Sequence, residues 1–224
     1  RVLLVDFDPQ GSATSGLGVA LNAEGADIYD MFFDKISLSD IVKETSIGNL
    51  HIAPSSRDLV GIEVEIGKTP GRELILRTQT RLLRTRYDYV LVDCPPSSGL
   101  LTLNAMGAAN YVLIPLQAEY YALEGLSDLV GTLRKVKANI TPNIEIEALV
   151  RTMYDPLSSL TNQVSDEIKS HFGDKLFDTV IPRNVRLAEA PSYGVPGVVF
   201  DPASKGALAY VAFAHEMVAR IAKL

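Results

Sequence analysis

The sequence predicts an α/β protein with a doubly wound, mostly parallel sheet and helices on both faces. Short apolar runs typical of buried strands alternate with helix-like segments along the whole chain. Two of these runs end abruptly in aspartate, proline and small residues. The 224 residues, 47% hydrophobic and 21% charged, are enough for one domain with a proper core. With no repeat or linker along the chain, we expect a single domain over residues 1–224.

The first half of the chain predicts short elements separated by turn residues. The opening apolar run is a strand, and the small residues after it can start a helix. Pro54 closes the second strand, and the Gly- and Pro-containing cluster at 67–71 separates two helices. The expected strands are 2–5 and 50–53, and the expected helices are 12–18, 38–44, 57–66 and 73–83.

The second half predicts longer elements in the same alternation. The expected strands are 89–93, 111–115, 144–152 and 179–181, and the expected helices are 101–109, 123–137, 161–171 and 205–222. A loop rich in proline and glycine is expected over 191–202. In the last helix, residues at helical spacing form one mostly apolar face, and we expect that face to pack on the core. That face consists of Leu208, Val211, His215, Val218 and Ala222.

Composition excludes several classes of protein. No apolar run approaches the roughly 20 residues of a membrane-spanning helix, and the start of the chain lacks the features of a signal peptide. The single cysteine excludes an internal disulfide framework and indicates a cytoplasmic protein, and the scattered histidines make no zinc-binding spacing. A net charge of −6 argues against a protein that binds nucleic acid with its whole surface, but it is compatible with a local basic patch.

Asp8 and Asp93 are the candidate chemical groups, because each follows an apolar strand. Ligands of parallel α/β sheets bind beyond the carboxyl ends of the strands. A carboxylate there can hold Mg²⁺, usually through water, or orient an attacking water. The two prolines after Asp93 suit the first role, and the compact segment 11–14 after Asp8 suits the second. The alternative is that both aspartates only cap the helices that follow them.

Five segments, in order, resemble the ParA/Soj chromosome- and plasmid-partitioning ATPases. The first is similar to the second motif of that family, and the next to its Walker B segment. Together the matches extend over nearly the whole chain, which makes the resemblance far more specific than one acid-ended strand. The matching segments are 6–18, 92–97, 115–125, 152–155 and 181–194.

The resemblance implies a P-loop NTPase fold and a deviant-Walker ATPase of the MinD/ParA type. Such proteins bind Mg-ATP, pair face to face as ATP-dependent homodimers and hydrolyse ATP slowly. Their dimers bind DNA without sequence preference, so they are nucleoid-associated, and a ParB-like centromere-binding partner stimulates them. Asp8 then corresponds to the catalytic, water-orienting aspartate, Asp93 to the acid near Mg²⁺, and Pro182 and Asn184 to residues at the adenine.

The main departure from the family is the phosphate-binding loop, which the family places on a strand and helix before the position of Arg1. No segment of this chain substitutes for that loop. We therefore expect an N-terminally truncated domain that is hydrolytically inactive by itself. We also expect the neighbours of the absent strand to have open ladder groups.

Basic residues in the carboxyl-terminal part are candidates for DNA contact, because the family uses basic residues of that region. Asp174 and Asp178 lie among them, so a salt-bridged surface is the alternative. The candidates are Lys169, Lys175, Arg183, Arg186 and Lys205.

Two other functions compete with DNA segregation. A MinD-like membrane-surface ATPase would use a basic amphipathic tail, and no such tail follows the last expected helix, so no membrane contact is expected. An inert adaptor that has lost its phosphate-binding loop is the other.

Cys94, beside Asp93, has no histidine near it in sequence and is interpreted as a packing residue rather than a nucleophile.

Overall fold

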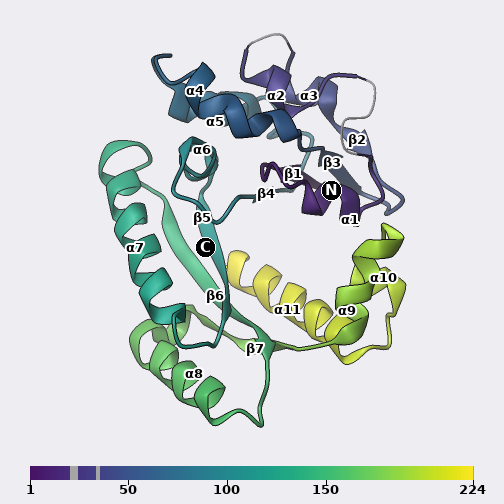
Figure 1. The fold of residues 1–224 in the computed structure, drawn as a ribbon, viewed down its shortest axis with the longest axis vertical. Coiled ribbons are helices and arrows are strands. Elements are labelled where there is room, and N and C mark those ends of the chain that lie inside the picture. Colours follow the sequence, from purple (N-terminus) through teal and green to yellow (C-terminus); the bar gives the residue numbers. More distant parts are fainter. Residues whose placement is uncertain (21–24, 34–35, 224) are drawn as a thin grey trace. The chain divides into compact units, whose positions relative to one another are not determined.

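A computed structural model describes residues 1–20, 25–33 and 36–223 and confirms the mixed α/β class, with parallel sheets and helices (Figure 1). The chain divides into two compact units. Unit 1 comprises Arg1–Ala109 and Ala138–Pro142, and unit 2 comprises Asn110–Lys137 and Asn143–Leu224. The single-domain organisation expected for residues 1–224 stays a prediction, and each unit is described by itself.

Unit 1 is built on a sheet in which the two acid-ended strands are neighbours. Its strand order is β2-β3-β1-β4, with β1 parallel to β3 and β4, and β2 antiparallel to β3. The register places Asp6 directly opposite Asp93. Both strands therefore end at the same level of the same sheet. The strands are β1 (Val2–Asp6), β2 (Lys43–Glu44), β3 (Leu50–Ala53) and β4 (Tyr89–Asp93).

The helices of unit 1 build its core on one face of this sheet. Leu3, Val5 and Phe7 alternate along β1 and its end and are completely buried there. On β4, Tyr89 and Leu91 point to the other face and are exposed. The helices are α1 (Ser12–Gly16), α2 (Ile28–Met31), α3 (Leu38–Ile41), α4 (Ile62–Glu65), α5 (Ile75–Arg81) and α6 (Leu100–Ala108), with the 3₁₀ turns η1 (Arg57–Gly61) and η2 (Arg72–Leu74).

Unit 2 contains a parallel sheet with helices on both faces (Figure 1). Leu149 of the central strand points to α7 and α8, whereas Ala148 and Val150 point to α11. The strands are β5 (Tyr111–Gln117), β6 (Glu145–Tyr154) and β7 (Leu176–Pro182). The helices are α7 (Ala122–Asn139), α8 (Ser159–Phe172), α9 (Val185–Glu189), α10 (Gly197–Phe200) and α11 (Lys205–Ile221), with the 3₁₀ turns η3 (Gly173–Lys175) and η4 (Ala190–Tyr193).

The packing face predicted for α11 is wrong. Leu208, Val211 and Val218 are 57%, 47% and 46% exposed. The face against the core instead presents Phe213 and Met217, together with Ala209, and the Phe213 ring meets that of Phe177 edge to face at 4.8 Å. Both faces satisfy helical spacing, so periodicity alone does not distinguish them. The larger aromatic and thioether side chains fill the space above β7.

Three local expectations also need correction. The helix expected over 38–44 ends at Ile41, because Val42 is extended at ψ 130°, and the next two residues form β2. The segment 57–66 begins as a 3₁₀ turn before it becomes α4. The region 191–202 is not an uninterrupted loop, since η4 and α10 lie within it.

Glu216 and Arg220 of α11 attach that helix to β7, the outer strand of its sheet. The two carboxylate oxygens of Glu216 accept hydrogen bonds from the amides of Asp178 (2.9 Å) and Thr179 (3.0 Å). The Arg220 guanidinium lies 4.3 Å from the centroid of the Phe177 ring and also donates to the Leu176 carbonyl. Polar contacts therefore hold the helix along the strand in addition to its apolar face.

Within the described ranges, β4 pairs only with β1, and β5 pairs only with β6. Each of these strands is therefore the outermost strand at one edge of its sheet, as β2 and β7 are at the opposite edges, and the open ladder groups expected beside an absent strand stay a prediction. None of the described helices is both long and apolar enough to cross a membrane.

Candidate active site

The loop from β1 to α1 folds around the carboxylate of Asp6. This side chain is fully buried, and its Oδ2 accepts hydrogen bonds from the amide (2.7 Å) and the hydroxyl (2.6 Å) of Thr14. Its Oδ1 accepts a longer bond from the amide of Asp8 (3.3 Å). Burial raises the pKa of Asp6, and the bonds from Thr14 and Asp8 oppose that rise. Asp6 is therefore the anchor of this loop, a role that the sequence analysis did not assign.

Ser55, which follows β3, fixes the same loop from the neighbouring strand. Its amide donates to the Thr14 hydroxyl (3.0 Å), and its own hydroxyl donates to the carbonyl of Asp8 (2.5 Å). Ser55 and Thr14 are both buried. The backbone of Asp8 is thus held through its amide by Asp6 and through its carbonyl by Ser55.

Asp8 itself is half-buried, and its carboxylate makes no capping hydrogen bond to α1. Its Oδ1 accepts a hydrogen bond from the Gln10 amide (2.9 Å), and its carbonyl accepts one from the Gly11 amide (2.9 Å). Gly11 closes this turn at φ 64°, in the left-handed region that favours glycine, and α1 begins after it without a side-chain cap. The alternative that Asp8 caps α1 is therefore wrong.

Asp93 lies at the exposed end of β4, next to this loop. Its carbonyl accepts a hydrogen bond from the Phe7 amide (2.8 Å), which ties the ends of the two strands together. Its carboxylate has no hydrogen-bond or ion-pair partner in the part of the chain that the structure describes. The carboxylate is therefore available to a ligand.

The segment after β4 is held by other side chains. The Thr102 hydroxyl of α6 donates to the carbonyls of Ser97 (2.5 Å) and Pro95 (3.2 Å). The first amide of α6, that of Leu100, donates to the Glu63 carboxylate (2.5 Å). Since Glu63 occupies the start of α6, the capping alternative for Asp93 is wrong too.

The carboxylates of Asp6 and Asp8 lie near enough to Asp93 for their charges to act on it. Partial burial raises the pKa of Asp93, and the negative charges of Asp6 and Asp8 raise it further. A divalent cation would relieve that repulsion, and carboxylate oxygens are ligands that Mg²⁺ prefers. No group of three or more metal-ligating side chains is present in the described ranges, so a Mg²⁺ ion here would also need phosphate oxygens and water. The residues fit a magnesium site shared with a nucleotide.

Cys94 has the environment of a packing residue. Burial, with the charges of Asp93 and Asp8, raises the pKa of its thiol to about 12. Its sulfur donates to the Val92 carbonyl at 3.5 Å. A thiol that stays protonated at neutral pH is a poor nucleophile, which supports the interpretation made from the sequence.

Pro182 and Asn184, the residues expected at the adenine, belong to unit 2. Pro182 ends β7, and Asn184 caps α9 by accepting hydrogen bonds from the amides of Arg186 (2.9 Å) and Leu187 (3.3 Å). The Asn184 side-chain oxygen is therefore already used, which leaves its amide N–H groups for a ligand. Their adenine role stays a prediction.

The basic candidates for DNA contact fall into two groups. Arg186 forms ion pairs with Glu189 (2.9 Å) and Asp201 (3.4 Å), and the Lys175 ammonium donates to the Ile146 carbonyl (2.5 Å). The other candidates are exposed and have no ion pair among the described residues. They are Lys169, Arg183 and Lys205. The predicted alternative, pairing with Asp174 and Asp178, is likewise not found in that part of the chain.

Comparison with known proteins decides the family. A family model described as an AAA domain matches residues 1–146. The sporulation initiation inhibitor protein Soj of Bacillus subtilis is 47% identical over 98% of this chain and 87% of its own length. The chromosome partitioning protein ParA of Caulobacter vibrioides NA1000 is 43% identical over 98% of this chain and 83% of its own length. The chain belongs to the ParA/Soj family of chromosome-partitioning ATPases.

Solved structures support the ParA/Soj fold. Cobyrinic acid a,c-diamide synthase from Mycobacterium smegmatis, bound to an ATP analogue and magnesium, has a TM-score of 0.85 and 30% identity over 97% of this ParA/Soj chain and 82% of its own. The septum site-determining protein MinD from Pyrococcus horikoshii has a TM-score of 0.77 and 23% identity, with coverage of 97% and 83%, and shows likeness of fold alone. The chromosome-partitioning ATPase Soj of Thermus thermophilus, 47% identical over 99% of this chain and 84% of its own length, places ATP hydrolysis in the family.

Proposed function

We propose that this protein is a DNA-segregation ATPase that binds Mg-ATP, dimerises when ATP is bound and holds DNA without sequence preference. A ParB-like partner stimulates its hydrolysis. The observation that carries the proposal is the doubly anchored Asp8 beside the unpartnered Asp93, at the carboxyl ends of adjacent parallel strands. The identity to Soj and ParA over nearly the whole chain supports the biological setting.

Asp8 has the environment of a water-orienting residue. In hydrolysis the oxygen of water attacks the γ-phosphorus, the bond from that phosphorus to the bridging oxygen breaks, and ADP and phosphate leave. A carboxylate that accepts a hydrogen bond from the attacking water aligns it for the attack. One oxygen of Asp8 already accepts from Gln10, which fixes the plane of the carboxylate and leaves the other oxygen for that water. The proton of the water ends on phosphate or on this carboxylate.

Asp93 is the residue that would hold Mg²⁺, through water. When bound, the ion neutralises charge on the phosphate oxygens during transfer. Its charge would also lower the raised pKa of Asp93, so nucleotide binding and ionisation of this carboxylate favour each other. Pro182 and Asn184 are proposed to contact the adenine.

DNA binding is proposed to use Lys169, Arg183 and Lys205, which are the exposed members of the candidate set without an ion pair among the described residues. Arg186 and Lys175 are weaker candidates because protein oxygens already bind their charged groups.

The substitution Asp8→Ala tests the proposal. We expect steady-state ATP hydrolysis to fall by about 10²–10⁴-fold, while ATP affinity, ATP-dependent dimerisation in sedimentation and salt-sensitive DNA binding remain. Asp128→Ala removes an exposed acid of α7 and is the matched control. Hydrolysis that survives in Asp8→Ala would remove the catalytic assignment. Dimers that form with ATP but ignore DNA would instead overturn the segregation role.

A further inference from the structure

A hollow at the amino end of the sheet in unit 2 has an apolar floor. It lies where the last turns of α7 pass the start of β6, and its volume is about 390 Å³. Val130 and Leu133 of α7 form the floor together with Ile144 and Ile146. Leu133 and Ile144 are buried, and the other two pack against the core cluster that α7 and α8 share. A floor of this kind and a volume of this size are typical of sites for small molecules.

The rim of this hollow is positively charged. Of the described residues that line it, Arg134, Lys137 and Lys175 are cations and Glu145 is the one acid, which leaves a surplus of two positive charges. The whole chain, in contrast, has a net charge of −6. The hollow therefore attracts anions on a molecule that repels them on average.

The cations of the rim keep donors for a ligand. The Lys137 ammonium lies 3.2 Å from the Glu145 carboxylate, and the Lys175 ammonium donates to the Ile146 carbonyl. An ammonium has three N–H donors, so both lysines retain further donors. The Arg134 guanidinium has no ion pair or hydrogen bond with any residue in the part of the chain that the structure describes.

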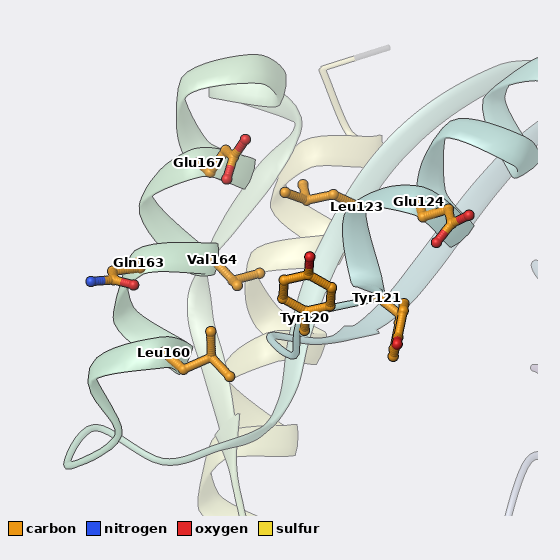
Figure 2. A pocket seen from close by; sticks show the side chains of 8 residues that line it. All are labelled: Tyr120, Tyr121, Leu123, Glu124, Leu160, Gln163, Val164 and Glu167. Carbon is orange, nitrogen blue, oxygen red and sulfur yellow. The ribbon is translucent and has the colours of Figure 1, made fainter.

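A second hollow of unit 2 has the opposite charge. Figure 2 shows it between α7 and α8, where the charged residues that line it are Glu124 and Glu167. Tyr120 and Tyr121 also line this acidic hollow, whereas no aromatic ring from the described ranges lines the positive one. A floor of branched aliphatic side chains suits a flexible hydrocarbon chain better than a flat ring, which prefers an aromatic partner.

We infer that the positive hollow binds a free aliphatic carboxylate, that is, a hydrocarbon chain that ends in one acid group. The chain packs on Val130, Leu133 and Ile146. The carboxylate accepts hydrogen bonds from the planar guanidinium of Arg134 and from the ammonium of Lys175. β6 is paired with a strand on each side, so its backbone offers no ladder to an extended peptide, and a small amphiphile fits better.

This inference goes beyond the proposed function, because the hollow lies at the amino end of β6 and makes no use of hydrolysis. The residues proposed to contact the adenine, Pro182 and Asn184, lie at and beyond the carboxyl end of the parallel strand β7. Binding is measured without nucleotide. A negative result here leaves the assignments of Asp8 and Asp93 intact, and loss of those assignments leaves the hollow untouched.

The test is a titration of the isotope-labelled protein with octanoate, followed by the NMR shifts of its backbone amides. We expect saturable shifts at the residues around the positive hollow. Octanol, which has the same chain without the charge, and butanoate, which has a shorter chain, should each bind about tenfold or more weakly. Arg134→Gln and Lys175→Gln should each weaken octanoate binding by about tenfold.

Arg84→Gln is the matched control, because it removes the same charge from an exposed position in unit 1. It should bind octanoate normally, and circular dichroism should show every variant folded. Absence of saturable shifts, octanol bound as tightly as octanoate, or affinity unchanged in both variants of the hollow would overturn the inference. Shifts centred on the acidic hollow of Figure 2 would do the same.

Two further results would assign the hollow to another occupant and overturn the inference. Displacement of octanoate by a short DNA duplex would show that nucleic-acid phosphates bind there. Co-sedimentation with phosphatidylglycerol vesicles that depends on Arg134 would show that a lipid surface does.

Discussion

Thr14 is the residue on which the geometry of the catalytic loop most depends, because its hydroxyl donates to Asp6 and accepts from Ser55. Thr14→Val keeps the shape and removes both bonds, which leaves a buried carboxylate oxygen and a buried amide short of partners. We expect the free energy of unfolding to fall by about 1–3 kcal/mol, measured by urea denaturation, and ATP hydrolysis to fall with it.

Thr14→Ser is the control, since it keeps the hydroxyl and should retain most of the stability and the activity. Equal loss in both variants would show that the methyl group, rather than the hydrogen bonds, stabilises the loop.

Asp93 gives a prediction about pH. Its pKa in the folded protein is raised above the unfolded value of about 3.9. Folding therefore favours the protonated acid, and stability is lost as pH rises through the folded pKa. Without Mg²⁺ or nucleotide, Asp93→Asn should stabilise the protein slightly at neutral pH, because solvent screens the repulsion at this exposed position, with no gain below the unfolded pKa.

Asp40 should change stability with pH in the opposite direction to Asp93. Hydrogen bonds from Ser37 lower its pKa, so its contribution to stability is present at neutral pH and is lost on acidification. Asp40→Asn should therefore destabilise the protein at neutral pH. Thermal unfolding curves of both variants across pH measure the two slopes, and slopes of the same sign would contradict the assignment.

The candidate site could be predicted from the sequence only at its most local level. Asp8 and Asp93 are recognisable because each follows an apolar strand, and parallel strands present their carboxyl ends at one edge. Ser55 could not be found, because it reaches Asp8 across 47 residues of sequence and only after β3 is placed beside β1. Asp6 looks like the last residue of a strand, and its anchoring role depends on a hydrogen bond to Thr14 that spacing does not specify.

At the scale of the element, α11 offers a direct test of which face packs. Met217→Ala should cost about 2 kcal/mol of unfolding free energy, because Met217 packs against the cluster that contains Phe177. Val218→Ala, the next residue on the exposed face, should change stability by less than about 0.5 kcal/mol. Chemical denaturation measures the unfolding free energy of both variants. A larger loss for Val218→Ala than for Met217→Ala would show that the face expected from periodicity packs on the core.

Elements with a long pattern were predictable, and those fixed by one or two polar contacts were not. The pattern over 161–171 became α8 with bounds that differ by one or two residues. α2, in contrast, has four residues and depends on a capping box between Asp27 and Asp30, and α9 depends on the Asn184 cap. Short helices carry too little periodicity to be recognised, so their caps are the better signal.

At the scale of the whole molecule, the proposed DNA binding predicts a salt dependence. Changing Lys169, Arg183 or Lys205 to glutamine should weaken binding to any DNA sequence. Each phosphate that the protein no longer neutralises should reduce the slope of log affinity against log salt by about 1. Arg186→Gln should reduce the slope less, because that guanidinium is already ion-paired. Fluorescence anisotropy with duplexes of unrelated sequence measures these slopes. If the slope is unchanged in every variant, these residues do not form the DNA-binding surface.

Glu216 affects how separate molecules meet. β7 is the outermost strand of its sheet, and the amides of Asp178 and Thr179 would otherwise offer two free donors to a passing strand of another copy. The Glu216 carboxylate accepts a hydrogen bond from each of these amides. Its negative charge also repels the carbonyl oxygens of an approaching strand. One side chain on α11 therefore leaves another copy two fewer donors to pair with at this edge, and we expect slow deuterium uptake at those two amides.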